Sequence, residues 1–429
     1  MAFKPLKTND LRAGIYVRLN YKWSEHPFLR NTFKISSIRE IAIIHKHGLT
    51  DIEYDPERSD PEALKKLETH APRNATDVKK ILDMEISGEE KELQDKKDVR
   101  IKAFKRRRES INKTEKLYQK TLTEGRGMIK DINAGSDRGL EIADSIIESI
   151  ITTLNGNSSQ TSLINETENI DNNSISFMHA LNVCILSMTI GNELGMKRNE
   201  MHMLGLGALL HDIGKLNIPA AVRLKKGKLT MAEISMMKMH PQYGKDMATK
   251  VAYFPKNSID IIYQHHECLD GSGYPQGIKS TNILYMSRIV SAVNEYDNLT
   301  NDLTPGARNY TPTEVLGHFY KNRQKALSPE VIVSLINTMT VYPPGSIVRL
   351  NDGSIGMVIR INHKHRMKPM ILVHEPEVAK EDAIIVDLAE DIDYEIEESL
   401  VPRQVSRETL KYLNPANMNG YFLSDSESS

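Results

Sequence analysis

The fold is decided by the stretch Ala208-Leu209-Leu210-His211-Asp212-Ile213-Gly214-Lys215. Leu204 shares a helical face with His211, so this histidine lies on the buried stripe of an apolar helix. Asp212 is its direct neighbour, and Gly214 indicates that the helix ends just past the pair. An adjacent His-Asp pair alone is weak evidence of a site, because it occurs by chance in many chains. The pair becomes evidence of a site only if other segments of the sequence supply further ligand residues.

More polar residues of the middle region stand on or beside apolar helical faces, as His211 does. They are His179, His240, His265, His266 and Asp297. A lone histidine in that setting is most often a satisfied core residue. Burying an unpaired carboxylate, however, costs free energy or shifts its pKa, so burying the whole ordered set is economical if its members share a metal.

The chemistry of these donors predicts two divalent metal ions. Only two cysteines occur, Cys184 and Cys268, so the ligands are expected to be nitrogen and oxygen donors. Imidazole with carboxylate suits iron or manganese, while zinc, nickel and magnesium remain open. Two ions ~3.5–4 Å apart, with one carboxylate bridging, are a recurring solution for displacement at phosphorus, where they turn a bridging water into hydroxide. Lys215, one turn from the pair, is placed to meet a phosphate oxygen.

The composition describes a protein of several domains without a strong electrostatic partner. Its 429 residues predict two or three units, since a single packed domain seldom exceeds ~250–300 residues. With 56 basic and 57 acidic residues the formal net charge is -1, so neither a polymeric nucleic acid nor a membrane is expected as a partner. The sequence shows no signal peptide and no uncharged apolar run of ~18 residues, so we expect no membrane span and a cytoplasmic location.

Changes in pattern along the chain predict an α+β fold. We expect a mostly α-helical bundle, with a small N-terminal α/β domain and a β-rich C-terminal segment. A run of charged helix formers at about 88–125 predicts a connecting helix or coiled-coil-like spacer between them. The predicted borders are 1–85, 86–135, 136–340 and 341–429.

Local signals add detail to this division. Gly48 is a plausible C-cap of a helix that begins after Ile35. The segment Asn155 to Asn173 is rich in Asn, Ser and Thr and predicts a loop. Asn351-Asp352-Gly353 predicts a hairpin turn, and the polar tail Ser424 to Ser429 is expected to be disordered. Core-filling side chains are expected at Met236, Met237 and Met239.

Four motifs look like those of the HD-GYP family, the bacterial cyclic-dinucleotide phosphodiesterases within the wider HD superfamily. They are His211-Asp212-Ile213-Gly214-Lys215, His240-Pro241 with Gly244, His265-His266-Glu267, and Asp270-Gly271-Ser272-Gly273-Tyr274-Pro275 with Gly277. The resemblance covers about 140–340, and the last two motifs at this spacing are hardly expected by chance. Residues 1–60, with Gly14-Ile15-Tyr16-Val17 and Trp23…His26-Pro27-Phe28, resemble less specifically the small domain often fused ahead of this family (DUF3391).

The resemblance implies a role for each site residue. One metal would be held by His179, His211, Asp212 and Asp297, and a second by the bridging Asp212 with His240, His265 and His266. Asp212 and Lys215 would be the catalytic residues, with Lys215 on the scissile phosphate. Further substrate contacts would come from Asp270, Gly273, Tyr274, Pro275 and Arg308. Gly271 and Gly273 fit a tight loop, because glycine allows the positive φ angles that such turns need.

Two departures from the family pattern change what is expected. Some members carry a Glu four residues before the first histidine, which completes a three-metal site. Ile175 stands there in this chain and has no ligand atom, so two metals are expected. The segment after Asp297 usually runs Thr-x-Asp-Arg-Pro-Tyr-Arg, whereas here it reads Thr-Asn-Asp-Leu-Thr-Pro-Gly-Ala-Arg, ending at Arg308. The basic residues that the family uses on the substrate phosphates are therefore partly missing or displaced.

The expected function is hydrolysis of cyclic di-GMP or of 3',3'-cGAMP to a linear dinucleotide, by a hydroxide on the two-metal centre. The alternative is a catalytically weak or inactive receptor or signalling adaptor, which the altered segment after Asp297 suggests. A phosphohydrolase for mononucleotides fits less well, because of the Gly-Tyr-Pro loop. A homodimer through the helix at about 88–125 and a signalling-protein partner at the Gly-Tyr-Pro loop are also open.

Overall fold

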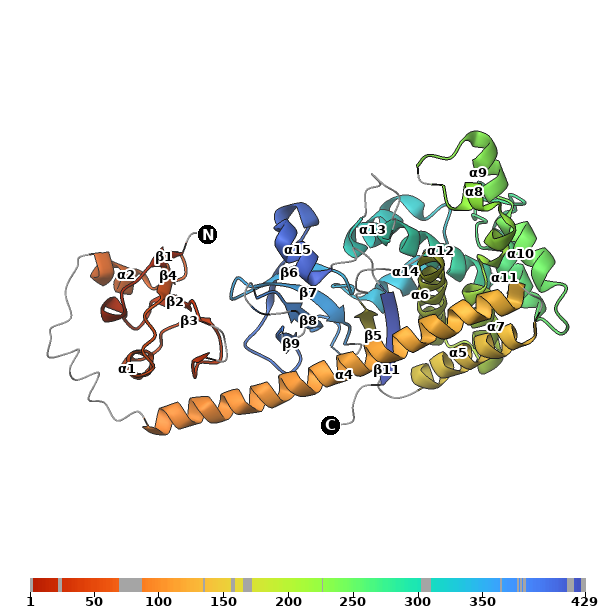
Figure 1. Ribbon diagram of the computed structural model, residues 1–429. Helices are drawn as coiled ribbons and strands as arrows, with labels where there is room; N and C mark the ends of the chain where they lie inside the picture. The colour runs from red at the N-terminus through yellow and green to blue at the C-terminus, as the bar shows by residue number, and fades with distance from the viewer. Residues whose placement is uncertain are drawn as a thin grey trace. The chain divides into compact units, whose positions relative to one another are not determined.

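Residue contacts in the computed structural model assign residues 1–108 and 375–382 to a smaller unit and residues 109–374 and 383–429 to a larger one (Figure 1). The border falls inside one continuous helix, α4 (Ser87–Asn133), which confirms the helix predicted there. Trp23 and Arg308 lie outside the described residues, so their interpretations stay predictions. The structure describes residues 3–21, 25–68, 87–133, 136–155, 159–164, 172–225, 227–301, 310–362, 365–375, 378, 380, 383–414 and 420–425.

The smaller unit holds an antiparallel sheet and helices. Its strand order is β1 (Lys4–Pro5), β4 (Ile52–Asp55), β2 (Tyr16–Leu19) and β3 (Thr32–Lys34). Along β2, buried residues alternate with more exposed ones, as in a half-buried strand. The helices are α1 (Ile38–Lys46) and α2 (Pro61–Glu68). Gly48 follows the end of α1 with a φ of +65°, which confirms the predicted C-cap.

Helix α4 contributes buried residues to both units, although its sequence is mostly polar. In the smaller unit, Lys97 is 2% exposed and its ammonium donates to the backbone oxygens of His26 and Phe28. In the larger unit, Tyr118 and Leu122 are buried in the main apolar core. The helix is therefore an integral part of two cores.

The larger unit is built around helix α6 (Asn172–Glu193), which packs against α7 (Arg198–Leu209), α12 (Tyr285–Thr300) and α14 (Pro329–Met339). Its segment Ile175–Glu193 is long and apolar enough to cross a membrane, although we expected no apolar run of that length from the sequence. Of that window, 78% is buried inside the protein, as is usual for the core helix of a bundle. Other helices of the unit are α5 (Arg138–Asn155), α10 (His240–Ala248), α11 (Lys256–Gln264), α13 (Pro312–His318) and α15 (Arg407–Leu413).

Helix α9 (Met231–Met237) contradicts part of the predicted core. It packs on α8 (Ala220–Arg223), and Figure 1 shows the pair projecting from the bundle. Met236 and Met239 are 39% and 40% exposed, so their interpretation as core filler is wrong. None of the residues of α9 is buried, because a helix of two turns that stands clear of the bundle has no core to fill.

The C-terminal sheet joins strands that are distant in the sequence. Its order is β10 (Ile396–Leu400), β6 (Ile347–Leu350), β7 (Ile355–Arg360), β5 (Ser159–Ile164) and β11 (Gly420–Asp425), while β8 (Met370–Val373) pairs with β7 and with β9 (Ile385–Asp387). The turn between β6 and β7, with Gly353 at a φ of +87°, confirms the predicted hairpin. With its helical bundle and two small sheets, the protein has the predicted α+β fold.

Two predictions fail at the β5–β11 pair. The loop expected from Asn155 to Asn173 contains β5, and the first two residues of the tail expected to be disordered, Ser424 and Asp425, belong to β11. Residues 156–158, 165–171 and 426–429 lie outside the described residues, so the predictions for them stay predictions. Their register joins Gly420 to Ile164 and Asp425 to Ser159. Strand β5 is mostly polar, whereas β11 places Tyr421, Phe422 and Leu423 in the apolar core. Each strand forms because the other, distant in the sequence, supplies its hydrogen bonds.

Candidate metal centre

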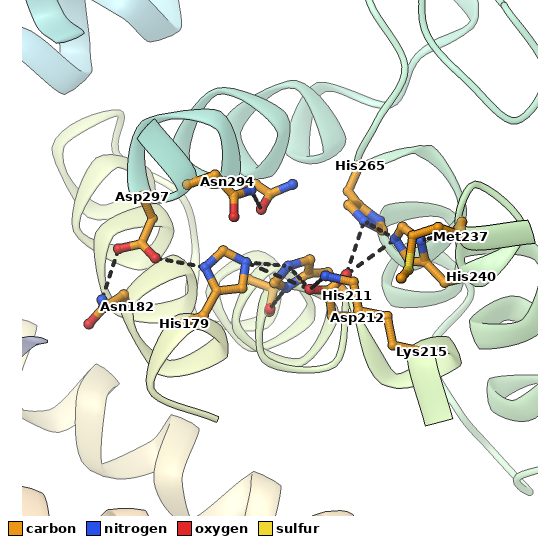
Figure 2. A network of polar contacts seen from close by, with 12 residues as sticks. His179, Asn182, His211, Asp212, Lys215, Met237, His240, His265, Asn294 and Asp297 are labelled. Carbon is orange, nitrogen blue, oxygen red and sulfur yellow. Dashed lines mark hydrogen bonds and ion pairs between the residues drawn. The ribbon is translucent and has the colours of Figure 1, made fainter. Parts of the chain in front are cut away.

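Most of the candidate ligands lie where helices of the bundle begin or end, and His179 and Asp297 lie inside helices (Figure 2). His179 stands within α6. His211 and Asp212 follow the last residue of α7, which ends two residues before the pair rather than just past it. His240 is the first residue of α10, His265 is the C-cap of α11, and His266 follows it.

Three of the histidines are oriented by the same local device. The Nδ1 atoms of His211, His240 and His265 lie 2.7, 2.8 and 2.7 Å from the carbonyl oxygens of Ala208, Met237 and Ile262. Each bond reaches back three residues to the histidine's own helical turn. A carbonyl oxygen only accepts, so Nδ1 carries the proton in each ring, and Nε2 of the neutral ring keeps its lone pair.

Asp212 is the residue on which these rings converge. Its Oδ1 lies 3.2 Å from Nε2 of His240 and 3.8 Å from Nε2 of His265. Its Oδ2 lies 3.4 Å from Nε2 of His211 and 3.7 Å from Nε2 of His179. Two groups of donor atoms therefore share this carboxylate, one oxygen each. The first contains His179, His211 and Asp212, and the second contains Asp212, His240, His265 and His266.

These donors fit divalent cations, because without a cation they repel one another. The Nε2 atoms of His179 and His211 are 3.3 Å apart, and those of His240 and His265 are 3.1 Å apart. With Nδ1 protonated, each pair sets lone pair against lone pair. Oδ1 of Asp212 is buried, and no described residue forms a hydrogen bond with it. A cation in each group would satisfy the ring nitrogens and the orphaned oxygen together.

The electrostatics hold the ligands in the protonation state that a metal needs. Burial lowers the pKa of His211, and it lowers the pKa values of His265 and His266 well below their usual range. Burial by itself would raise the pKa of the Asp212 carboxyl. The Lys215 ammonium is the largest influence in the opposite direction, and the pKa of Asp212 is held well below its usual value. Neutral imidazoles and an ionised carboxylate result.

Asp297 reaches this arrangement through His179. Its Oδ2 accepts a hydrogen bond of 2.7 Å from Nδ1 of His179, and its Oδ1 accepts bonds of 2.8 and 2.9 Å from the amides of Asn182 and Asn301. Figure 2 shows Asp297 on the side of the His179 ring that faces away from Asp212. Asp297 therefore orients His179 in this structure and lies outside both donor groups.

The Gly-Tyr-Pro loop borders the second donor group. The ring of Tyr274 stacks on that of His266, with centroids 4.5 Å apart and planes 18° apart. The ammonium of Lys238 lies 5.2 Å from the centroid of the Tyr274 ring. The peptide bond between Tyr274 and Pro275 is cis. Asp270 is exposed, and its carboxylate accepts hydrogen bonds from the backbone N–H and the hydroxyl of Ser272, so it shapes its own turn.

The two glycines of this loop are required for different reasons. Gly271 has a φ of +82°, as expected. Gly273 does not lie in the left-handed region, so the reason predicted for it is wrong. A Cβ at Gly273 would lie 2.4 Å from the backbone nitrogen of Cys268 and 2.5 Å from Cα of Glu267. The loop folds back onto the chain that carries His266, and only glycine allows that approach.

Two residues that build the site, Glu267 and Asn182, were given no role from the sequence. Glu267 is 2% exposed, and its carboxylate accepts the backbone N–H groups of Gln276 and Ile278, which fastens the loop. Its only sequence signal was its place directly after two histidines. Asn182 stands one turn from His179 in an apolar helix, which makes it a buried polar residue in need of partners. Ile175 is half-buried and packs on the apolar core.

Comparison with known proteins adds independent findings. Residues 153–331 match the family model described as HD domain, and residues 3–141 match that described as domain of unknown function (DUF3391). A cyclic di-GMP phosphodiesterase of Pseudomonas aeruginosa is 25% identical over 386 residues, which cover 86% of this chain and 84% of that protein. The 3'3'-cGAMP-specific phosphodiesterase 3 of Vibrio cholerae is 30% identical over 165 residues, 38% of this chain and 35% of that protein.

Among solved structures, an HDG"Y"P protein from Bdellovibrio bacteriovorus matches with a TM-score of 0.38 and 17% sequence identity. The match covers 78% of this chain and 98% of that chain. The chain thus spans most of the Pseudomonas relative and about a third of the Vibrio relative.

Proposed function

This chain is an HD-GYP family protein with a DUF3391 domain ahead of its HD domain, and from this premise we propose that it is a metal-dependent phosphodiesterase which opens a cyclic dinucleotide to a linear one. One observation carries the proposal, namely the two donor groups that share Asp212. A carboxylate with one oxygen in each group is suited to bridging a pair of divalent ions, and paired ions recur in enzymes that displace an oxygen at phosphorus.

We expect the histidines to bind the ions and Lys215 to contact the substrate. When bound, two divalent ions would supply a water nucleophile at neutral pH and neutralise phosphate charge. The histidines would hold them with their Nε2 atoms. Lys215, whose side chain is 37% exposed, contacts Oδ2 of Asp212. Once cations neutralise Asp212, the Lys215 ammonium would be free to contact a phosphate oxygen or the leaving oxygen.

The substrate class follows from the groups at the edge of the centre. Burial raises the pKa of the Tyr274 phenol far above its usual value, so the hydroxyl stays protonated and can donate a hydrogen bond. Lys238 adds a second ammonium beside this ring. The guanidinium of Arg288 donates from Nε and Nη2 to the backbone oxygens of Ile283 and Ser280, so we do not assign it a phosphate contact. The relatives named for cyclic di-GMP and for 3'3'-cGAMP make these two dinucleotides the candidates.

The test is a hydrolysis assay of cyclic di-GMP and 3',3'-cGAMP side by side, with purified protein loaded with manganese or iron and the products separated by chromatography. We expect a linear dinucleotide from at least one of them. Asp212→Ala should abolish ion binding and turnover together, whereas Asp246→Ala, which removes an exposed carboxylate of α10, should change neither. Absence of turnover with both dinucleotides and both metals would refute the proposal.

The same assay decides between an enzyme and a receptor. The altered segment after Asp297 motivates the receptor alternative. A receptor would bind one of the dinucleotides, measured by calorimetry, and would release it unchanged.

A further inference from the structure

A buried chain of hydrogen bonds connects the C-terminal strand to the metal centre. The backbone N–H of Tyr421 in β11 donates to Oδ1 of Asn182 at 2.8 Å. The amide nitrogen of Asn182 donates to Oδ1 of Asp297 at 2.8 Å, and Nδ1 of His179 donates to Oδ2 of Asp297 at 2.7 Å. Asn182 and Tyr421 are 0% exposed and Asp297 is 1% exposed, so water does not compete for these bonds. Figure 2 shows Asn182 and Asp297 on the side of the His179 ring that faces away from Asp212.

The position of β11 explains why an amide stands at residue 182. Strand β11 lies at the edge of its sheet, and among the described strands β5 is its one neighbour. The N–H of Tyr421 meets Asn182, on α6, and would otherwise be a buried donor without a partner. An asparagine accepts with its oxygen and donates with its nitrogen, so one side chain satisfies this N–H and fixes the Asp297 carboxylate. An aspartate at residue 182 would set two carboxylates against each other. An alanine would remove the partner of the Tyr421 N–H and one of the two amide hydrogen bonds to Oδ1 of Asp297.

The orientation of the His179 ring depends on this series of hydrogen bonds. Three of the other four imidazoles in the donor groups, those of His211, His240 and His265, are held by a carbonyl of their own helical turn. His179 has a carboxylate from α12 instead, and that carboxylate takes its own position from Asn182 and Asn301. The ring of His179 is thus oriented by residues that are distant in the sequence, and the C-terminal strand is one of the segments that supply them.

We propose that Asn182 is a positioning residue for the ion held by His179, His211 and Asp212, and that strand β11 is a structural part of this metal centre. The proposal rests on the proposed function only for the presence of metal. It means that the region matched by the HD-domain model, residues 153–331, supplies every donor of this group but fixes the orientation of His179 together with residues 420–425.

Manganese binding to the full-length protein tests the proposal without reference to turnover. We expect two Mn²⁺ ions per wild-type chain, by calorimetry and elemental analysis. Asn182→Ala should lose about 10–100-fold in affinity for one ion and keep the other, because loss of the groups that orient a ligand typically costs that much. The matched control is Tyr421→Phe, which removes the buried contact of 3.4 Å to the hydroxyl of Tyr296 but keeps the backbone N–H. It should bind both ions like the wild type.

A purely structural role for Asn182 predicts a different pattern. It would lower the melting temperature of the metal-free protein in Asn182→Ala and leave the affinity for both ions unchanged, which would overturn the proposal. Equal loss of ion affinity in Tyr421→Phe would also overturn it. Absence of hydrolysis in the wild-type protein, with both ions bound, would count against the proposed function and not against this inference.

Hydrogen exchange of the unmutated protein covers the case in which Asn182→Ala does not fold. If the centre and the strand are coupled, the coupling is reciprocal, so Mn²⁺ that stabilises His179 also stabilises β11. We expect backbone amides of residues 420–425 to exchange more slowly in manganese-loaded protein than after chelation. Equal exchange in the two states would contradict the proposal.

Discussion

Replacement of Gly214 by alanine should disable the metal centre from a position that bears no ligand. Gly214 lies on the short turn Ile213–Asn217 that follows Asp212, and this turn packs against α10. A Cβ at Gly214 would lie 2.0 Å from the backbone oxygen of His240 and 2.3 Å from the backbone nitrogen of Gly244. Backbone atoms cannot change rotamer as side chains can, so the turn Ile213–Asn217 and helix α10 must move apart.

The size of that separation follows from the same contact. Real Cβ atoms essentially never approach closer than 3.0 Å, so the 2.0 Å contact must open by about 1 Å. Oδ1 of Asp212 and Nε2 of His240, now 3.2 Å apart, face each other across this interface. Overpacking of this kind costs ~1–3 kcal/mol of stability. A displacement of 1 Å at reacting groups costs about 100-fold in rate.

Calorimetry with Mn²⁺ and the hydrolysis assay together measure this prediction. Gly214→Ala should weaken ion binding and lower kcat by about two orders of magnitude, while the protein stays folded. Gly317→Ala in α13 is the matched control, because a Cβ there meets nothing within 4 Å. It should add roughly 0.5–1 kcal/mol of stability and leave ion binding unchanged. Wild-type affinity and turnover in Gly214→Ala would show that the reasoning from this contact is wrong.

Three further predictions concern other parts of the chain. Burial, with Lys97 nearby, lowers the pKa of His26 from 6.5 to about 4, so the stability that its neutral ring provides is complete above pH 6.5 and is lost as pH falls toward 4. The loss is up to about 3 kcal/mol for the smaller unit, and it should be absent in His26→Gln when unfolding is followed by the fluorescence of the only tryptophan. Thr340 has a φ of +64° and a buried hydroxyl oxygen without a partner, so Thr340→Gly should stabilise the larger unit by roughly 1 kcal/mol in thermal unfolding, and a lower melting temperature would contradict the strain. Lys238→Gln should raise KM for the dinucleotide by about 2–5-fold, whereas Lys245→Gln, whose ammonium lies 4.1 Å from another tyrosine ring, should not, and equal KM values would exclude Lys238 from substrate binding.

The ligand candidates were accessible from the sequence because their signals are local. An imidazole on an apolar helical face is visible in a short window, and the device that aims it lies within the same turn. His211, for example, is oriented by Ala208, three residues earlier. The sequence also indicated Asp212 as the shared carboxylate through the resemblance, and the geometry around it supports that role.

Features that depend on distant contacts escaped the sequence. Strand β5 was expected to be a loop because a polar segment shows its strand character only when β11 lies beside it. The need for glycine at residue 273 lies in the backbone of Glu267 and Cys268, which no turn pattern reveals. Met236 has the composition of a core residue, but α9 stands where no core is available. In each case the missing information is the position of another segment.

The bond between Asn182 and the backbone of Tyr421 has a consequence for the order in which the protein assembles. The two partners are 239 residues apart, so ribosomes produce Asn182 long before the strand that satisfies it. Asp212, His240, His265 and His266 are all synthesised while that strand is still missing. A growing chain can therefore assemble the second donor group first, and the His179 side is completed only after residues 420–425 have emerged and paired with β5.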